Sequence, residues 1–446
     1  MKRSALPPGP AMPTAMQMVG FWTRPLAFLE RCRERYGKRF TIRLPGTPPF
    51  VMLTDPEEVK QVFTSPPDVL QPGQGARRVL EPIVGTNSVI LLDEAAHMEQ
   101  RKLMLPAFHG ERMERLTGLM QEVSAEEVAD LPRSTPVALH PRMQELTLKV
   151  ILRAVFGLDP GSRFDALRER MREMLVFGDR PISLMPPPPG SLLARAAERA
   201  GPFARFLQVQ EEVDEILFAL IAERRQDGAD RDDVLSMLVE ARHEDGSPMS
   251  QQEIRDELLT LLVAGHETTA TSLAWAFARL VHEPRVLERL VEEVDAGEDA
   301  YVTATIQETL RARPVLPNVA PRRVAKPVEI GGWSYEPGCN LVANGYLIHH
   351  DPDIYPDPYA FRPERFLDES PGTYTWIPFG GGRRRCLGAS FAMLEMKVVL
   401  SALLSSCELR DAGDGVEVAQ RRNITVRPAG GARVVLGKRS RLPLAA

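Results

Sequence analysis

The chain has 446 residues, more than one simple hydrophobic core usually contains, and its 43% hydrophobic and 26% charged residues are typical of a globular protein. The formal net charge of -5 argues against a nucleic acid as the main partner. The four cysteines show no paired spacing, which excludes a zinc site of the Cys-x-x-Cys type and fits a reducing compartment without disulfides. Prolines at positions 7, 8 and 10 break the apolar run that a signal peptide needs, and residues 15–22 are apolar over too short a span to cross a bilayer, so we expect a cytoplasmic protein.

The first part of the chain is predicted to combine short helices with a hairpin. Residues 1–24 form a proline-rich lead-in, and residues 25–36 have the apolar spacing of a helix that Gly37 closes. Two short β-type runs on either side of residues 45–49 predict a hairpin. The pattern is helical from residue 55, with a loop-rich break at 70–93 that we expect to form an access loop.

The middle of the chain is predicted to be helical. Helical periodicity covers residues 96–153, 164–177 and 202–225, and the four prolines at 186–189 predict a stiff connection above a pocket. The longest helix begins at a capping box formed by Ser250 and Glu253 and continues to about residue 282. Its central residues are so apolar that we expect it to be buried on nearly all sides.

The last third contains a helix at 301–313, strand-like runs at 328–330 and 340–343, and a helix that begins at Ala389. No internal repeat or long linker interrupts the sequence. We therefore predict a mainly α fold with a minor β region, arranged as one domain over residues 1–446 around the long central helix.

A segment rich in glycine and arginine, residues 379–388, delivers Cys386 to the start of the last helix. Free N–H groups at a helix N-terminus favour a thiolate, and the glycines leave room for a flat ligand beside it. Cys386 could therefore be a metal ligand or a nucleophile, and an inert buried thiol is the ordinary alternative. A nucleophile needs a histidine–acid pair that no pattern nominates, whereas a haem ligand needs a thiolate with cations nearby.

Glu267 and Thr268 stand in the apolar middle of the long helix, in the segment Ala264-Gly265-His266-Glu267-Thr268-Thr269. Burying an acid and a hydroxyl is costly unless they have partners or a task. One interpretation is a proton relay into a pocket; the other is that Thr268 bonds a backbone carbonyl and Glu267 points to water. A zinc-protease helix is excluded because position 270 is alanine.

Several cations and one carboxylate elsewhere could serve the same region or could simply lie on solvated faces. They are His97 with Arg101, the Arg322–Arg323 pair, Arg384, and Glu308 with Arg311 and Arg365. An anionic ligand would give the cations a common purpose.

Four motifs together resemble the signature of the cytochrome P-450 haem-thiolate monooxygenase superfamily, in its soluble bacterial type. They are Phe379-x-x-Gly382-x-Arg384-x-Cys386-x-Gly388, Glu308-x-x-Arg311, the segment 361–366, and the segment 264–269. They occur in the family's order, and the resemblance extends from about Leu6 to the C-terminus.

The resemblance implies a haem b cofactor and a role for each motif. Cys386 would be the axial iron ligand, and Glu267 and Thr268 would deliver protons to dioxygen. The other residues implied at the haem are His97, Arg101, Ala264, Arg322, Phe379, Arg384 and Gly388, with Arg323 as an alternative to Arg322. Glu308, Arg311 and Arg365 would form a structural triad that braces the cysteine loop.

The resemblance also implies a lipophilic substrate that is hydroxylated or epoxidised. The residues expected to contact it are Ile83, Val84, Val315, Leu316 and Ile424. Electrons would come from a separate ferredoxin or flavodoxin, docked near Lys102, Arg383 and Arg385, onto a monomeric enzyme. A peroxide-driven or isomerising enzyme, and a non-catalytic haem-binding protein, remain as alternatives.

Overall fold

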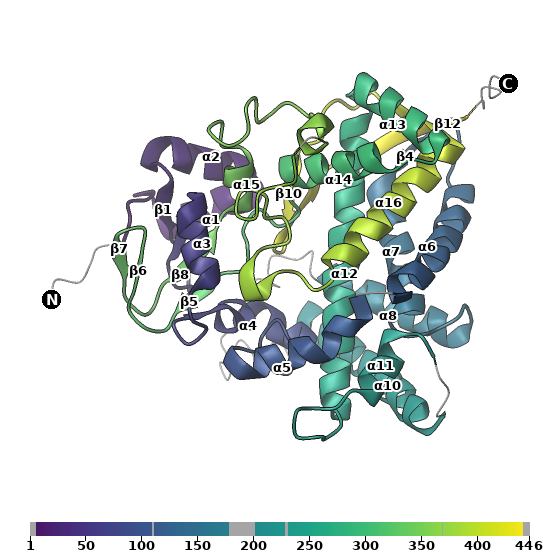
Figure 1. Ribbon diagram of the computed structural model, residues 1–446, viewed down its shortest axis with the longest axis horizontal. Helices are drawn as coiled ribbons and strands as arrows, with labels where there is room; N and C mark the ends of the chain where they lie inside the picture. The colour runs from purple at the N-terminus through teal and green to yellow at the C-terminus, as the bar shows by residue number, and fades with distance from the viewer. Residues whose placement is uncertain (1–5, 109–110, 178–200, 228–230, 368, 440–446) are drawn as a thin grey trace.

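The computed structural model describes residues 6–108, 111–177, 201–227, 231–367 and 369–439, and within them the predicted mainly α fold with a minor β region is confirmed (Figure 1). The α-helices are α1 (Thr14–Thr23), α2 (Pro25–Tyr36), α3 (Pro56–Thr64), α4 (Pro72–Val84), α5 (Glu94–Met104), α6 (Glu111–Ala129), α7 (Leu139–Ala154), α8 (Ser162–Phe177), α10 (Pro202–Asp227), α11 (Val234–Glu240), α12 (Gln251–Leu280), α13 (Pro284–Ala296), α14 (Ala300–Ala312), α15 (Gly345–His349) and α16 (Ala389–Ser406). The strands are β1 (Arg39–Ile42), β2 (Phe50–Leu53), β3 (Leu70–Gln71), β4 (Pro136–Ala138), β5 (Arg322–Val324), β6 (Val328–Ile330), β7 (Trp333–Tyr335), β8 (Asn340–Ala343), β9 (Cys407–Asp411), β10 (Ala419–Arg422), β11 (Thr425–Pro428) and β12 (Arg433–Lys438).

Helix α12 passes through the middle of the molecule, as Figure 1 shows, and the other helices pack around it. Its predicted capping box is present, because the Ser250 hydroxyl accepts from the Glu253 N–H and the Glu253 carboxylate accepts from the Ser250 N–H. Leu258, Leu259 and Leu262 are fully buried, but Leu261 and Val263 are partly buried and Ala264 is exposed, so the predicted burial on nearly all sides is correct only in part. Helix α12 thus provides a long, rigid support inside the core.

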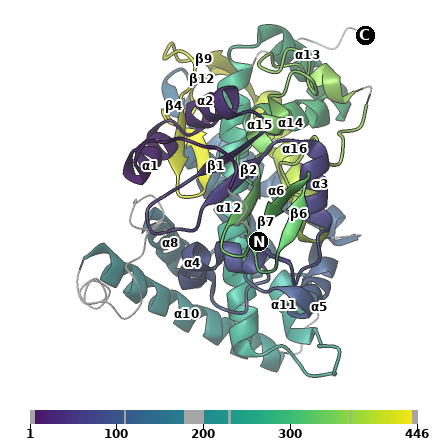
Figure 2. The ribbon, with the colours of Figure 1, turned by 90° about the vertical axis from the view of Figure 1, so that its left-hand side faces the viewer.

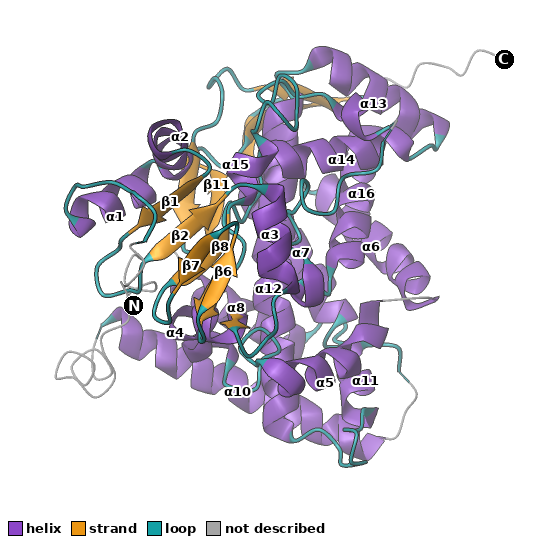
Figure 3. Ribbon diagram, turned by 60° about the vertical axis from the view of Figure 1, so that its left-hand side comes forward, coloured by secondary structure: helices purple, strands orange, loops and turns teal. Residues whose placement is uncertain are grey.

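The largest sheet lies on one side of α12 (Figure 3), with strand order β1-β2-β8-β5-β3. The predicted hairpin around residues 45–49 is confirmed by the antiparallel pairing of β1 with β2. Strand β8 pairs in parallel with β2 and antiparallel with β5. Arg322 of β5 therefore lies next to strand β8 inside the sheet. The small β10–β11 hairpin is tied to α12 by a hydrogen bond of 2.9 Å from the Trp275 indole to the Val426 carbonyl.

The prediction of a loop-rich break at 70–93 is wrong in part, because residues 72–84 form helix α4. Pro72 is compatible with the first turn of a helix, and the two N–H groups after it, of Gly73 and Gln74, are accepted by the Asp93 carboxylate. That cap comes from 20 residues further along the chain. Local sequence patterns therefore contain no signal for it.

The flanks of the central proline run are helices α8 and α10, as predicted, and the view in Figure 2 places α10 beside the lower part of α12. The prolines at 186–189 lie outside the described residues. Helix α16 is long and apolar enough to cross a membrane by length and composition, but its Val399, Leu400 and Leu403 are fully buried in the core.

Replacing Ser250 by alanine should lower the free energy of unfolding by about 1 kcal/mol, because the N-cap bond of α12 is lost. Chemical denaturation followed by circular dichroism measures the change. Thr303→Ala is the matched control, since the Thr303 hydroxyl bonds only a carbonyl of its own exposed helical turn. Equal effects of the two substitutions would show that the capping box does not stabilise α12.

Candidate functional site

The cysteine loop is held tightly against helix α3. Gly380 and Gly382 have φ values of 67° and 63°, which favour glycine. A Cβ on Gly381 would lie 2.4 Å from the Phe63 ring, and one on Gly382 would lie 2.4 Å from the Phe63 carbonyl. These glycines therefore serve the turn and its close approach to α3. The expectation that they clear space for a ligand holds only for Gly388, where a Cβ would meet nothing within 4 Å.

Cys386 differs from the other three cysteines. Cys32, Cys339 and Cys407 are buried in apolar clusters, whereas the Cys386 side chain is exposed. The backbone N–H of Cys386 donates to the Phe379 carbonyl at 2.9 Å, which fixes the turn that presents the sulfur.

The N–H groups at the start of the last helix favour the Cys386 thiolate, as predicted, but without a ligand they do not lower its pKa below the ordinary value. Desolvation by neighbouring protein atoms raises the pKa of the Cys386 thiol although its side chain is accessible to solvent, and the Gly388 N–H, Arg101 and Arg385 offset this only in part. A bound cation at the sulfur would supply the missing stabilisation of the thiolate.

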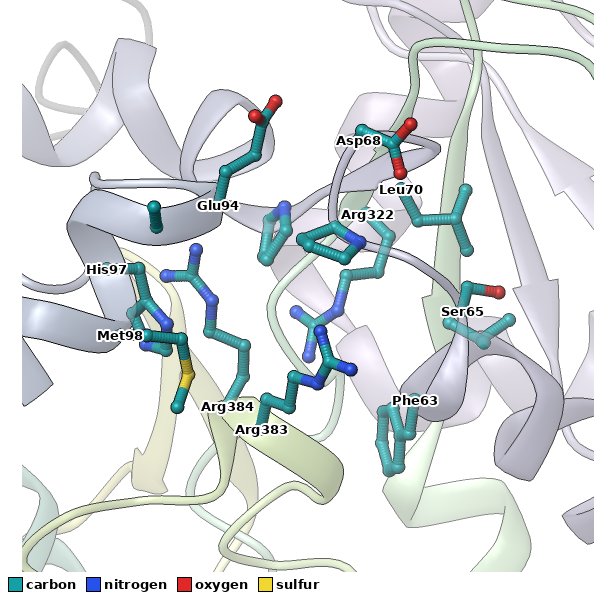
Figure 4. A pocket seen from close by; sticks show the side chains of 14 residues that line it. Phe63, Ser65, Asp68, Leu70, Glu94, His97, Met98, Arg322, Arg383 and Arg384 are labelled. Carbon is teal, nitrogen blue, oxygen red and sulfur yellow. The ribbon is translucent and has the colours of Figure 1, made fainter.

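A pocket beside the cysteine loop gathers the predicted cations (Figure 4). His97, Arg322 and Arg384 line it together with Arg383, and the rest of its wall includes Phe63, Leu70 and Met98. The structure also distinguishes the doubled arginine, because Arg322 lines this pocket and its strand neighbour Arg323 does not. Side chains on a strand point to alternate faces.

Burial of these cations, together with their closeness to one another, lowers their pKa values. Burial, followed by the charges of Arg384, Arg101 and Arg322, lowers the pKa of His97 to about 3, so His97 is a neutral hydrogen-bonding group. Burial also lowers the pKa of Arg322 and that of Arg384 to about 10. The Asp93 carboxylate, 2.8 Å from Arg384, is the acid that acts on both arginines.

Arg101 interacts both with the cysteine loop and with a residue of the pocket. Its guanidinium donates to the Arg385 carbonyl at 2.8 Å. Its charge acts both on Cys386 and on His97. The thiol and the cation pocket are therefore parts of one site.

Glu267 is held in a buried polar network between α12, α7 and β10. Its carboxylate accepts from Gln144 and from Arg422, each at 2.6 Å, and from Thr271 at 3.1 Å. His140 lies 3.5 Å away. Burial alone would raise the pKa of Glu267, but the hydrogen bond with His140 and the charge of Arg422 outweigh it and lower the pKa to about 2.

Thr268 and Ala264 lie one turn apart on α12. The Thr268 hydroxyl donates to the Ala264 carbonyl at 2.6 Å, which is the backbone bond considered as one interpretation of the sequence. Ala264 is exposed although α12 is otherwise largely buried around it.

The three residues of the expected triad lie together. Glu308 and Arg311 are fully buried and form two hydrogen bonds of 2.6 and 2.8 Å. Arg365 reaches the same carboxylate at 3.5 Å, and Arg311 also donates to carbonyls of the segment 349–360. The triad thereby fixes the irregular segment that leads to the cysteine loop.

The expected substrate contacts differ in exposure. Val84 and Val315 are buried, Ile83 and Leu316 are partly buried, and Ile424 is 40% exposed at the turn between β10 and β11. The Val315 carbonyl accepts from the Val426 N–H at 2.8 Å, so Val315 and this hairpin form one wall.

Comparison with known proteins decides the family. The sequence profile of the cytochrome P450 family matches residues 6–435. The chain belongs to the cytochrome P450 family. It is 39% identical to cytochrome P450 135B1 of Mycobacterium tuberculosis over 96% of this chain and 91% of that protein, and 39% identical to cytochrome P450 138 of Mycobacterium bovis over 97% of both.

Solved structures show the same fold. The retinoic acid bound cyanobacterial CYP120A1 has a TM-score of 0.81 at 22% identity, covering 98% of this chain and 100% of that one. The heme domain of cytochrome P450DA has a TM-score of 0.83 at 22% identity, covering 98% and 99%. Family membership makes the chain a haem-thiolate monooxygenase in general terms, with haem whose iron is bound by a cysteine thiolate.

The residues present fit that cofactor. Arg322 is buried, Arg384 is nearly buried and pairs with the Asp93 carboxylate, and Arg101 is partly exposed. Guanidinium groups of this kind would pair with the two propionates of a haem. Cys386 is the exposed thiol beside them.

Sequence reasoning missed three residues of the site: Asp93, His140 and Arg422. Each acts on a distant partner, Asp93 on Arg384 and the other two on Glu267. The doubled arginine at 421–422 was a visible signal, but nothing local connected it to α12.

Glu267→Gln should change the acid sensitivity of the fold. Because the pKa of Glu267 is about 2 in the folded protein and about 4.3 in an unfolded chain, its charge stabilises the fold above pH ~4.3 and that stabilisation is lost as the pH falls toward 2. The variant should be less stable than the wild type at pH 7, and the difference should narrow on acidification. Unfolding midpoints between pH 7 and pH 3 measure this.

Glu223→Gln is the control, since Glu223 pairs with Arg163 at the surface and its pKa is also lowered. An exposed pair contributes little, so its difference from the wild type should stay small at every pH. If the difference in unfolding midpoint between Glu267→Gln and the wild type stayed the same at every pH, the low pKa of Glu267 would be contradicted.

Proposed function

We propose that this cytochrome P450 binds haem b iron through Cys386 and oxidises a lipophilic small molecule with dioxygen, using electrons from a separate protein. The observation that carries the proposal is the position of Arg101, whose charge reaches both the exposed Cys386 thiol and the cation pocket. A haem needs a thiolate ligand and propionate partners within one porphyrin's width of each other.

In this proposal the enclosed cations hold the propionates, with His97 as a neutral donor beside Arg101, Arg322 and Arg384. Phe379, Gly388 and Ala264 provide surface for the ring. The open space at Gly388 and the uncovered side of α12 at Ala264 support these assignments. When bound, the haem iron supplies the activation of dioxygen and the oxidation of a C–H or C=C bond.

Glu267 and Thr268 are proposed to move protons. With a pKa of about 2, Glu267 is ionised in the resting protein, so it acts as a proton acceptor and transient carrier rather than as a stored acid. Thr268 has its hydroxyl proton engaged by the Ala264 carbonyl and keeps its oxygen lone pairs for a water or an oxygen ligand.

The proposed substrate is lipophilic because the residues expected around it are apolar. Ile83 and Val84 close helix α4, and Val315, Leu316 and Ile424 come from the wall formed with the β10–β11 hairpin. Apolar walls with few polar groups are typical of sites for lipophilic ligands. Hydroxylation or epoxidation is the reaction proposed for such a ligand.

The proposed electron donor is a ferredoxin or flavodoxin that docks on the face of Cys386. Arg383 and Arg385 are exposed there. Lys102 is also exposed, and its ammonium pairs with Glu244 at 2.7 Å, so a donor would compete with that ion pair. A cytoplasmic, monomeric enzyme of one domain fits this proposal.

A peroxide-driven or isomerising enzyme is the second candidate. It is favoured by one observation: the Glu267 carboxylate is already occupied by Arg422 and Gln144. Such an enzyme would not need the relay.

Cys386→Ser should abolish the red-shifted Soret band of the reduced carbon monoxide complex, because a serine hydroxyl does not replace a thiolate as iron ligand. Difference spectra of the purified holoprotein measure this. The controls Cys32→Ala, Cys339→Ala and Cys407→Ala should keep the band, since these thiols are buried elsewhere. A wild-type protein that folds without haem would overturn the proposed function.

Thr268→Ala should keep the haem spectrum but divert a larger share of the electrons to hydrogen peroxide, because a hydroxyl that positions protons is lost. The assay is peroxide release per NAD(P)H consumed, with a surrogate ferredoxin and the apolar ligand that gives the largest spin-state shift in a screen. Ser272→Ala is the control, since the Ser272 hydroxyl bonds the Thr268 carbonyl within the same helix. Unchanged coupling in Thr268→Ala would favour the peroxide-driven alternative.

A further inference from the structure

Asp93 stands at the start of one helix and caps another. It occupies the N-cap position of α5, yet its side chain makes no cap bond there. The carboxylate instead accepts from Gly73 at 2.8 Å and from Gln74 at 3.1 Å, at the N-terminus of α4. This satisfies two N–H groups that the first turn of α4 leaves without helical partners.

The same carboxylate holds an arginine of the cysteine loop. The oxygen that accepts from Gly73 also accepts from the Arg384 guanidinium at 2.8 Å, and both side chains are nearly buried. Arg384 further donates to the Val89 carbonyl at 3.2 Å and to the Leu92 carbonyl. Of its five N–H groups, these bonds leave two for another partner.

The backbone is shaped to permit this contact. A Cβ on Gly73 would lie 2.3 Å from the Leu91 carbonyl and 2.7 Å from the Asp93 carboxylate. The next residue, Glu94, has a φ of 53°, which is uncommon for a residue other than glycine. Small size at position 73 is therefore required for Asp93 to reach α4.

We infer that Asp93 is a positioning residue that couples the cofactor side of the site to the substrate side. Arg384 lies two residues before Cys386, and α4 ends in Ile83 and Val84, the proposed substrate contacts. One carboxylate thus bridges the two ends of the site. This inference rests on the proposed function for the roles of Cys386, Arg384 and α4.

The bridge has two separable consequences. The cap orders α4, and the negative charge lies among the cations proposed to hold the propionates. Removing the charge should make the haem iron easier to reduce, because the site becomes more positive. Removing the cap should loosen α4 and with it the wall formed by Ile83 and Val84.

The test uses the haem-containing protein with Asp93→Ala, Asp93→Asn and Gly73→Ala. The readouts are hydrogen–deuterium exchange over residues 72–84 and the midpoint reduction potential. Asp93→Ala should speed exchange at least about fivefold, as expected for a lost N-cap, and should shift the potential to more positive values. Asp93→Asn retains one acceptor oxygen, so it should shift the potential with a smaller change in exchange.

Gly73→Ala retains the carboxylate but pushes it away from α4 and Arg384. It should change both readouts in the directions found for Asp93→Ala. If the Asp93→Ala variant loses its haem, the Gly73→Ala variant still tests the inference.

Asp233→Ala is the matched control, because Asp233 likewise caps a helix, α11, through the Ser236 N–H at 2.8 Å and pairs with a buried arginine, Arg224. It should lower the unfolding midpoint and leave both readouts unchanged. If Asp93→Ala changes exchange without the potential, or the potential without exchange, Asp93 does not couple the two sides and the inference is overturned. A wild type that lacks the thiolate spectrum would refute the proposed function instead, while the exchange data still report on the cap.

Discussion

The excess of positive charge beside the cysteine loop is the constraint on which the site depends. Arg101, Arg322 and Arg384 come from α5, β5 and the cysteine loop, and the cost of enclosing guanidinium groups near one another shows in the lowered pKa values of Arg322 and Arg384. Asp93 offsets part of that cost. In the proposed function, a dianionic cofactor would offset the electrostatic cost of bringing these cations together, and Arg101 connects them to the Cys386 loop through its hydrogen bond to the Arg385 carbonyl.

Helix α12 is the second element on which the site depends. Most of its apolar residues are buried, but Ala264 in its middle is exposed among the described residues. One helical turn after Ala264, the Glu267 side chain joins a polar network with Arg422 of β10 and with Gln144 and His140 of α7. These two elements lie far from α12 in the sequence. The arrangement keeps an ionised carboxylate next to Thr268 without leaving its charge unpaired.

Much of the architecture could be read from the sequence because it is encoded locally. Apolar periodicity and the Ser250 capping box located α12. Helix α4 was missed since its cap, Asp93, lies 20 residues away. The helix-terminus argument for the Cys386 thiolate was incomplete, because it did not include the desolvation that raises the thiol pKa in the protein without a ligand.

By itself, the sequence determined the family and the mainly helical fold, and it supplied the proposed list of chemically active side chains. Those follow from residue types at fixed spacings. Only the tertiary structure decided that Arg322 rather than Arg323 lines the pocket, that His97 is neutral, that Glu267 pairs with Arg422, and that Asp93 bridges α4 and Arg384. Each of these depends on how close segments remote in the chain come to one another, or on how far they exclude water from a side chain. Neither distance nor burial can be read from a local stretch of sequence.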